Sequence, residues 1–133
     1  MTESVITCSN VSKIFGPNPA QHLADMKANP GLSSAGYVYA VRDVNLEVRR
    51  GEMLVVMGLS GSGKSTLVRC LSRLIEITGG SVTVEGRDIA SLSEPELIDL
   101  RRRKMGMVFQ SFGLLPNRSV LENVAFPLEM RGQ

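Results

Sequence analysis

Residues 58–66 read Gly-Leu-Ser-Gly-Ser-Gly-Lys-Ser-Thr, a complete G-x-x-x-x-G-K-[ST] pattern. Its glycines permit backbone angles that other residues avoid, so consecutive N–H groups can turn inward around a phosphate. Lys64 adds a charge that reaches β and γ phosphates, and the Ser65 hydroxyl can ligate Mg²⁺. The segment therefore predicts a site for a nucleoside triphosphate with Mg²⁺, formed by Gly58, Leu59, Ser60, Gly61, Ser62, Gly63, Lys64, Ser65 and Thr66.

This loop needs a strand before it and a helix after it. The apolar run Met53–Met57 predicts a strand buried on both faces. After the loop, apolar residues recur at helical spacing and predict a helix: Leu67, Val68, Leu71, Leu74 and Ile75. A Gly/Ser-rich turn that matches by chance is the alternative. The order strand, loop, helix favours a binding site, with Lys64 as a catalytic residue.

Before the loop, alternation and β-branched residues predict strands at 5–8, 37–41 and 44–48, the last of them half-buried and antiparallel. Residues 17–36 are rich in Pro, Gly and Ser and predict an insertion of loop character, with a short helix over 21–28. Its lone histidine, His22, is predicted to lie on the surface.

Beyond the loop, a strand is predicted at 81–84 and another at 107–109, ending at Gln110. Between them, Ser93 and Glu96 form a capping-box pattern that begins a helix. The basic run Arg101–Lys104 closes this helix. It could form a nucleic-acid or lipid-headgroup patch, but cations at a helix C-terminus are favoured because the helix dipole attracts them and no aromatic platform accompanies the run.

Composition bounds the remaining classes. The chain has 133 residues, 43% of them hydrophobic, and a net charge of +2, which is too small to imply a nucleic-acid partner. No apolar run is long enough to span a membrane, and the N-terminus lacks a signal-peptide pattern. Cys8 and Cys70 give neither a disulfide framework nor metal-ligand spacing, and Cys70 is predicted to be a small buried residue. A reducing cytoplasm fits this cysteine usage.

Over essentially its whole length the chain resembles an ATP-binding-cassette (ABC) ATPase. The glycine-rich loop is followed by an apolar strand ending in Gln110 and by Ser-Phe-Gly-Leu-Leu-Pro, a pattern similar to the family's Q-loop. The resemblance implies that Gln110 is catalytic and a Mg²⁺ ligand; by itself it could be an ordinary polar residue at a strand end. Lys13–Gly16 resembles the aromatic loop, which implies that Phe15 stacks on adenine with Val41 on the other side. A core phenylalanine is the alternative.

Several segments are similar to the ATPase subunit of glycine betaine/proline uptake systems: Phe15–Pro17, the insertion before Val41–Val44, Met57–Arg69, Arg73–Glu76 and Val108–Phe112. The resemblance implies ATP hydrolysis by a homodimer that powers an osmoprotectant importer, whose other subunits hold the solute. It also implies a cytoplasmic position on the inner face of the membrane, and contact with the permease through Ser111–Leu121, with Leu114 and Leu115 as apolar anchors.

The expected fold is α/β, a P-loop NTPase with a RecA-like ABC core and an N-terminal antiparallel β-subdomain. No signature motif, Walker B strand or switch histidine follows Gln110. We therefore expect residues 1–133 to be the N-terminal part of one ATP-binding domain, with 120–133 beginning its helical subdomain. We also expect it to bind ATP without useful turnover, and the edge of 53–57 to be unpaired. The alternatives are an ABC ATPase for another solute, a different P-loop enzyme, an ABC-type DNA-repair ATPase and a non-catalytic nucleotide-binding fragment.

Overall fold

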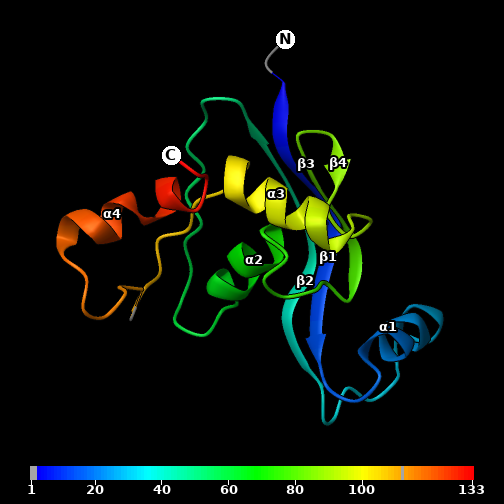
Figure 1. Ribbon diagram of the computed structural model, residues 1–133. Coiled ribbons are helices and arrows are strands. Elements are labelled where there is room, and N and C mark those ends of the chain that lie inside the picture. Colours follow the sequence, from blue (N-terminus) through cyan, green and yellow to red (C-terminus); the bar gives the residue numbers. More distant parts are fainter. Residues whose placement is uncertain (1–2, 112) are drawn as a thin grey trace. The chain divides into compact units, whose positions relative to one another are not determined.

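The computed structural model describes residues 3–111 and 113–133, and Figure 1 follows the chain through them. The chain divides into two compact units, Met1–Ser91 and Leu92–Gln133. The first unit contains a sheet, the glycine-rich loop and two helices, and the second contains two helices.

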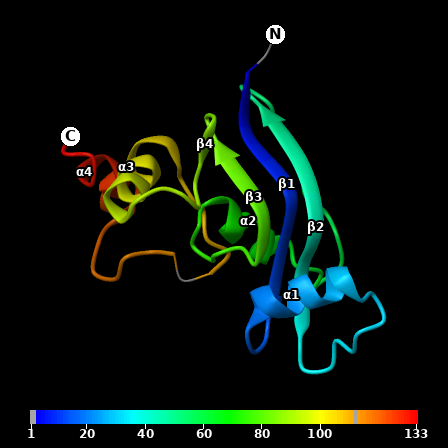
Figure 2. The same cartoon turned by 90° about the vertical axis from the view of Figure 1, so that its right-hand side faces the viewer.

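The sheet of the first unit has four strands in the order β2-β1-β3-β4. Their bounds are Ser4–Phe15 for β1, Val38–Arg49 for β2, Gly79–Val84 for β3 and Arg87–Asp88 for β4. All three pairings are antiparallel, and β1 lies between its two long neighbours (Figure 2). This confirms the predicted N-terminal antiparallel sheet. The two strands predicted at 37–41 and 44–48 form one continuous strand.

The core of the first unit lies between this sheet and α2, which runs from Lys64 to Leu71. Its buried apolar side chains come from β1, β2, α2, β3 and the residue that follows β4: Cys8, Val11, Ile14, Val41, Leu67, Cys70, Val82, Val84 and Ile89. Both cysteines are free thiols, and Cys70 is buried as predicted. Burial raises the pKa of Cys8 to about 11 and raises that of Cys70 as well. These thiols serve as small apolar core residues.

The insertion contains α1, Pro19–Ala28, so the short helix predicted within it is confirmed. The prediction for its histidine is wrong: the His22 side chain is only 5% exposed. Its Nε2 lies 2.8 Å from the Tyr39 hydroxyl. The two residues are 17 positions apart in the chain, so a local hydrophobic pattern could not predict this contact. A buried histidine needs such a polar partner, and β2 supplies it.

Two predictions around the glycine-rich loop also need correction. Residues 53–57 adopt no strand, and their apolar side chains are exposed, with Met53 at 88% and Met57 at 85%. A strand requires a hydrogen-bonded neighbour, and none of the described strands pairs with this run. The helix after the loop ends at Leu71, short of the predicted stripe. Leu74 lies beyond it and is exposed, following Arg73 at a φ of 52°.

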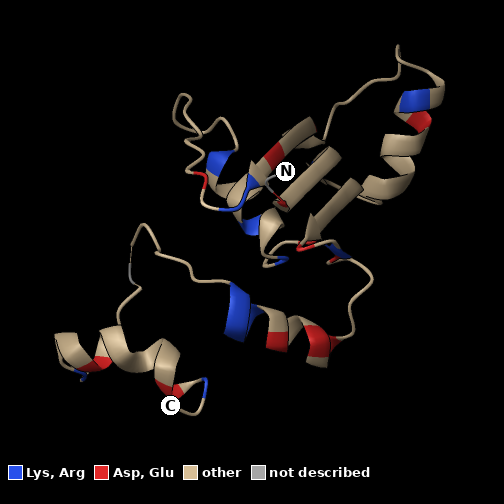
Figure 3. Cartoon of the chain, turned by 90° about the horizontal axis from the view of Figure 1, so that it is seen from above, with Lys and Arg blue, Asp and Glu red and all other residues tan. Residues whose placement is uncertain are grey.

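The second unit begins its helical structure with α3, Glu94–Lys104. The capping box of Ser93 and Glu96 is present, and the Ser93 N–H donates to Glu96 Oε2 at 2.9 Å. Figure 3 shows acidic residues near the start of α3 and basic residues at its end. This confirms that the basic run closes the helix, where the helix dipole favours cations.

The other helix, α4, spans Val120–Glu129 and also begins with a capping box, formed by Ser119 and Glu122. Hydrogen bonds from Ser119 lower the pKa of the Glu122 carboxyl. The strand predicted at 107–109 is absent: these residues have no assigned strand, and the Val108 side chain is fully exposed. Within the described residues, no helix combines the length and the hydropathy needed to cross a membrane.

Candidate functional site

The glycine-rich loop turns back on itself before it enters α2. The Ser62 N–H donates to the Leu59 carbonyl at 3.2 Å, which closes the turn. Gly61 and Gly63 have φ angles of 76° and 94°, in the left-handed region where glycine carries no steric penalty. The positive angles confirm the reason for which glycine was expected in this loop.

Gly63 is required for a second reason. A Cβ built on it would lie 1.9 Å from the backbone carbonyl oxygen of Ala40 and 3.1 Å from its carbonyl carbon. Any side chain here would displace either β2 or the start of α2, because both contacting atoms belong to backbone. The loop is therefore seated directly on strand β2. Ala40 was not identified from the sequence, since this contact is between backbone atoms distant in the chain.

The Lys64 ammonium lies over the loop. It donates to the carbonyl of Leu59 at 2.6 Å and that of Gly58 at 2.9 Å, and its Nζ is 3.3 Å from Ser62 Oγ. The charge is thus held above the concave backbone of residues 58–62. A phosphate bound in this loop would lie within reach of the Lys64 ammonium, which has three N–H donors for charge-assisted hydrogen bonds.

Lys64, Ser65 and Thr66 form the first turn of α2, with Gly63 as the N-cap. The Leu67 N–H closes the first helical bond to the Gly63 carbonyl at 2.9 Å. N–H groups of a first helical turn have no carbonyl partner within the helix, and the helix dipole places positive potential there. The hydroxyl-bearing residues thus stand where an anion is favoured.

Phe15 ends β1 and the residue is 44% exposed, so it is not a core phenylalanine. The Lys13 ammonium lies 5.0 Å from the ring centroid, a cation–π contact that restricts the ring. Val41, expected on the other side of a base, is only 5% exposed and belongs to the core. It therefore offers little surface to a ligand, and its contact with a base remains a prediction.

Gln110 is exposed and belongs to the second unit, whereas residues 58–66 belong to the first. The residues of the expected site are therefore divided between the two units. Phe112, within the expected permease contact, lies outside the described residues. Leu114 is exposed, and Leu115 is tied to α4 because its N–H donates to Asn123 Oδ1 at 2.7 Å.

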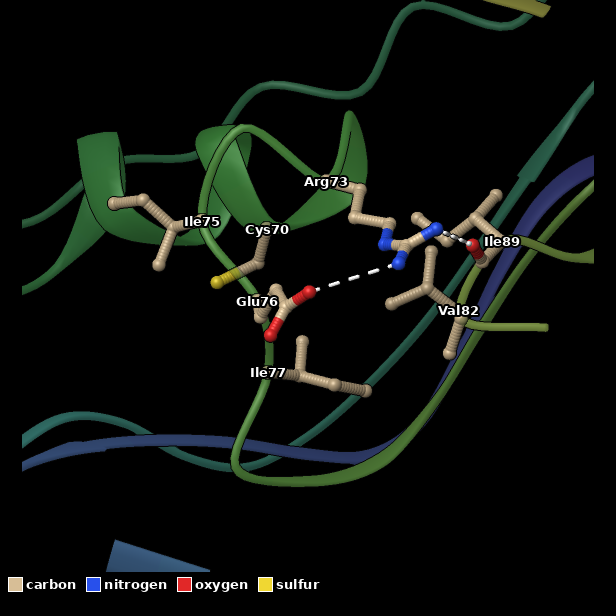
Figure 4. Close-up of a pocket in the computed structure, with 8 residues that line it drawn as sticks. Cys70, Arg73, Ile75, Glu76, Ile77, Val82 and Ile89 are labelled. Atoms are coloured by element: carbon tan, nitrogen blue, oxygen red, sulfur yellow. Dashed lines mark hydrogen bonds and ion pairs between the residues drawn. The ribbon is translucent and has the colours of Figure 1, made fainter. Parts of the chain in front are cut away.

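The described residues contain no group of three or more His, Cys, Asp and Glu side chains that could hold a metal ion. A cavity of about 170 Å³ lies beyond the C-terminal end of α2 (Figure 4). In it, Arg73 donates to the Ile89 carbonyl at 3.2 Å and lies 3.6 Å from the Glu76 carboxylate. None of residues 58–66 lines this cavity, so it is separate from the glycine-rich loop.

A glycine loop seated on a strand, a lysine above it and a helix beginning behind it define a P-loop nucleotide-binding site. The comparisons with known proteins agree. A family model described as ABC transporter matches residues 41–133. The chain belongs to the ABC transporter family, in its ATP-binding part, and its fold is that of an ABC ATPase.

The chain is 64% identical to the trimethylamine N-oxide transport system ATP-binding protein TmoW of Ruegeria pomeroyi, over 100% of this chain and 40% of the relative. It is 46% identical to the glycine betaine/proline betaine transport system ATP-binding protein ProV of Escherichia coli, over 92% of this chain and 32% of the relative. The chain thus spans about 40% of the TmoW sequence and less of ProV.

Among solved structures, the chain resembles the ATP-binding cassette MJ0796, in a dimeric post-hydrolysis state bound to ADP and Pi. The TM-score is 0.75 at 33% identity, over 95% of this chain and 47% of the other. This level of likeness supports the fold of the chain as a whole.

Proposed function

We propose that residues 1–133 form the nucleotide-binding part of the ATP-binding subunit of an ABC importer for small methylated amines. The observation that carries the proposal is the geometry of residues 58–64: a glycine turn pressed against the Ala40 carbonyl, with the Lys64 ammonium directly above it. The full subunit hydrolyses ATP as a dimer. The chain alone binds ATP without useful turnover, because it carries no Walker B or signature motif.

In this proposal, Lys64 exchanges its contacts with the loop carbonyls for contacts with β and γ phosphate oxygens. The backbone N–H groups of the loop and of the first turn of α2 bind the remaining oxygens. Mg²⁺ fits this arrangement, because it needs few protein ligands and shares phosphate oxygens. Ser65 is the ligand that the first unit would supply to Mg²⁺, which neutralises charge on the phosphates when bound.

Phe15 provides the platform for the base in this proposal. Its ring is exposed, and the Lys13 cation holds it in place. An aromatic face adds affinity for a planar base without reading its hydrogen-bonding edge. Val41 is proposed to contact the base from the other side, although only 5% of this residue is exposed.

The second unit provides the contact with the membrane subunits. Leu114, Leu121 and Val124 are exposed apolar side chains on or near the segment Ser111–Leu121. Exposed apolar side chains gathered in one segment suit a protein partner. The subunit then lies in the cytoplasm, on the inner face of the membrane, and a second ATPase subunit completes the homodimer.

The solute follows from the relatives. The proteins named for trimethylamine N-oxide transport are 64% and 51% identical to this chain, and the relatives named for glycine betaine are 44–46% identical. Both solutes are small molecules with a fully substituted, methylated nitrogen. We propose trimethylamine N-oxide as the preferred transported solute and glycine betaine as the second candidate.

Nucleotide binding is tested by titrating a fluorescent ATP analogue with Mg²⁺ into wild type, Lys64→Ala and Phe15→Ala. We expect the first variant to lose binding and the second to weaken it about tenfold, as removal of one stacked aromatic does. Lys104→Ala removes an equal charge in the second unit and serves as the matched control. Equal affinity of Lys64→Ala and wild type would refute the site.

The solute is tested by uptake of radiolabelled trimethylamine N-oxide into cells that carry or lack the complete transport system. Unlabelled trimethylamine N-oxide, glycine betaine and proline are added in separate competition experiments, and uptake of radiolabelled glycine betaine is measured in parallel. We expect uptake that requires Lys64 and is reduced most by unlabelled trimethylamine N-oxide. Uptake competed better by glycine betaine would reverse the order of the two solutes, and no uptake of either would refute the importer proposal.

A further inference from the structure

Segment 17–36 joins the end of β1 to the start of β2, and these two ends are paired with each other. Phe15 is in register with Val38, and Ile14 with Tyr39. The exposed Phe15 ring therefore stands at the root of the insertion. Figure 2 shows α1 at this end of the sheet, where β1 ends and β2 begins.

An aromatic stack built on the buried His22 closes the root of the insertion. The rings of His22 and Tyr37 are parallel within 3°, with their centroids 3.5 Å apart. His22 also meets the edge of the Tyr39 ring at 5.9 Å, and its Nε2 lies 2.8 Å from the Tyr39 hydroxyl. The His22 side chain of α1 thereby contacts Tyr37, which lies immediately before β2, and Tyr39, which lies near the start of β2.

The same stack reaches the residue that follows Phe15. A Cβ on Gly16 would lie 2.4 Å from Cδ1 and 2.9 Å from Cε1 of the Tyr37 ring. Tyr37 therefore packs directly on the Gly16 backbone. The Tyr37 ring, stacked on His22, thus lies against the backbone of the residue that follows Phe15.

Two further contacts hold the same end of β1 from the side of β3. The Ile14 N–H donates to Thr78 Oγ1 at 2.9 Å, and the Thr78 hydroxyl is 3.3 Å from the Ile14 carbonyl. Leu23 of α1 packs on Gly79, where a Cβ would lie 2.5 Å from Leu23 Cδ2. The insertion helix is thus anchored to both neighbours of β1.

We propose that His22 and Tyr37 are positioning residues for the base platform, and that the insertion sets nucleotide affinity through them. This inference rests on the proposed role of Phe15 as the surface on which the base stacks. Without the stack, the Gly16 backbone is released and the Phe15 ring loses its fixed orientation. The phosphate loop contacts β2 through the Ala40 carbonyl, a separate contact, so phosphate binding is retained.

Because base binding and phosphate binding depend on separate contacts, they can be measured separately. A purely structural role of His22 would affect both equally. ATP engages both the loop and the platform, whereas inorganic tripolyphosphate has no base and engages the loop alone. We would measure the affinity of the intact ATP-binding subunit for each by calorimetry, with Mg²⁺, in His22→Ala, His22→Phe and Tyr39→Phe. Gln21→Ala, an exposed position on the same helix, is the matched control.

We expect His22→Ala to weaken ATP binding about three- to tenfold, the range that the loss of one aromatic pair gives, and to leave tripolyphosphate binding unchanged. The same variant should raise the KM for ATP with kcat within about twofold. His22→Phe keeps a ring on Tyr37 and should restore most of the ATP affinity. Tyr39→Phe removes only the hydroxyl and should have a smaller effect in the same direction.

Three results would overturn the inference, and they differ from one another. If His22→Ala weakens ATP and tripolyphosphate equally, its role is general stability. If it weakens neither, the stack does not position the platform. If wild type binds ATP no more tightly than tripolyphosphate, the base platform itself is wrong, and the proposed role of Phe15 falls with it. Should His22→Ala fail to fold, Tyr39→Phe gives the same comparison with the ring retained.

Discussion

The substitution Gly63→Ala tests how the phosphate loop is seated on the sheet. Gly63 has a φ of 94°, and an added Cβ would lie 1.9 Å from the Ala40 carbonyl oxygen. The substitution therefore imposes two separate costs, a backbone conformation that L-residues avoid and an overlap with the backbone of β2. Gly86 in the turn between β3 and β4 shares the first cost only: its φ is 76°, and nothing lies within 4 Å of an added Cβ.

The two costs can be estimated separately. A non-glycine residue in the left-handed region costs about 1–2 kcal/mol. Relieving the overlap requires the carbonyl and the added carbon to separate by about 1 Å or more, and overpacking of this kind typically costs about 1–3 kcal/mol. We therefore expect Gly63→Ala to lower the free energy of unfolding by about 2–5 kcal/mol and Gly86→Ala by about 1–2 kcal/mol. A domain's total stability is only about 5–15 kcal/mol, so the first loss is severe.

Denaturant unfolding of the two variants and wild type measures both losses, and titration with a fluorescent ATP analogue measures binding. The start of α2 carries Lys64, so relief of the overlap displaces the ammonium from the loop. We expect ATP binding to weaken at least tenfold in Gly63→Ala and to be unchanged in Gly86→Ala, because charge-assisted hydrogen bonds depend closely on geometry. Equal unfolding free energies for the two variants, with ATP affinity retained in both, would refute the seating of the loop on Ala40.

Three other predictions follow from the structure. Because burial raises the pKa of Cys8 to about 11 from 9.0, we expect iodoacetamide at pH 8 to react with it roughly 100-fold more slowly in the folded chain than in denaturant; equal rates would contradict its burial. Ser119→Ala removes the hydroxyl that accepts the hydrogen bond of the Glu122 N–H at 3.2 Å, and should destabilise the start of α4 by about 1 kcal/mol. Faster hydrogen exchange of the Glu122 amide would show this loss, and Ser111→Ala is the control. The backbone amides of residues 54–57 should exchange their hydrogens far faster than the amide of Val82 in β3. Comparable protection would show that residues 54–57 are paired in a sheet.

Much of the first unit could be predicted because its signals are local. The turn of the glycine loop, the start of the helix behind it and the alternation of 44–48 each follow from residues adjacent in the chain, and the structure contains all three. The predicted end of that helix is wrong, because it stops at Leu71. The capping box at Ser93 is of the same kind, since both of its partners lie within one turn. These features depend on backbone angles and on hydrogen bonds between near neighbours.

The role of His22 could not be predicted, because its partners lie in a different element. Its environment is made by Tyr37 and Tyr39, which come 15 and 17 positions later, after the rest of α1 and the loop that follows. A lone histidine in a Pro- and Gly-rich segment has no periodic pattern that indicates burial. Two tyrosines alternating at the start of a strand were the only available signal, because residues i and i+2 share one face of a sheet.

The run 53–57 shows the limit of sequence pattern most directly. Its composition, Met-Leu-Val-Val-Met, is typical of a strand buried on both faces, yet the side chains are exposed and no strand forms. Composition records which environment a segment suits, whereas a strand forms only when another segment supplies its hydrogen bonds and covers its faces. The glycine loop that follows needs no such neighbour, because its turn and its seat on Ala40 are complete within the first unit. The glycine loop therefore keeps its turn and its seat on Ala40 although the run leading into it forms no strand. We expect nucleotide binding, which depends on the loop, not to require that residues 53–57 pair as a strand.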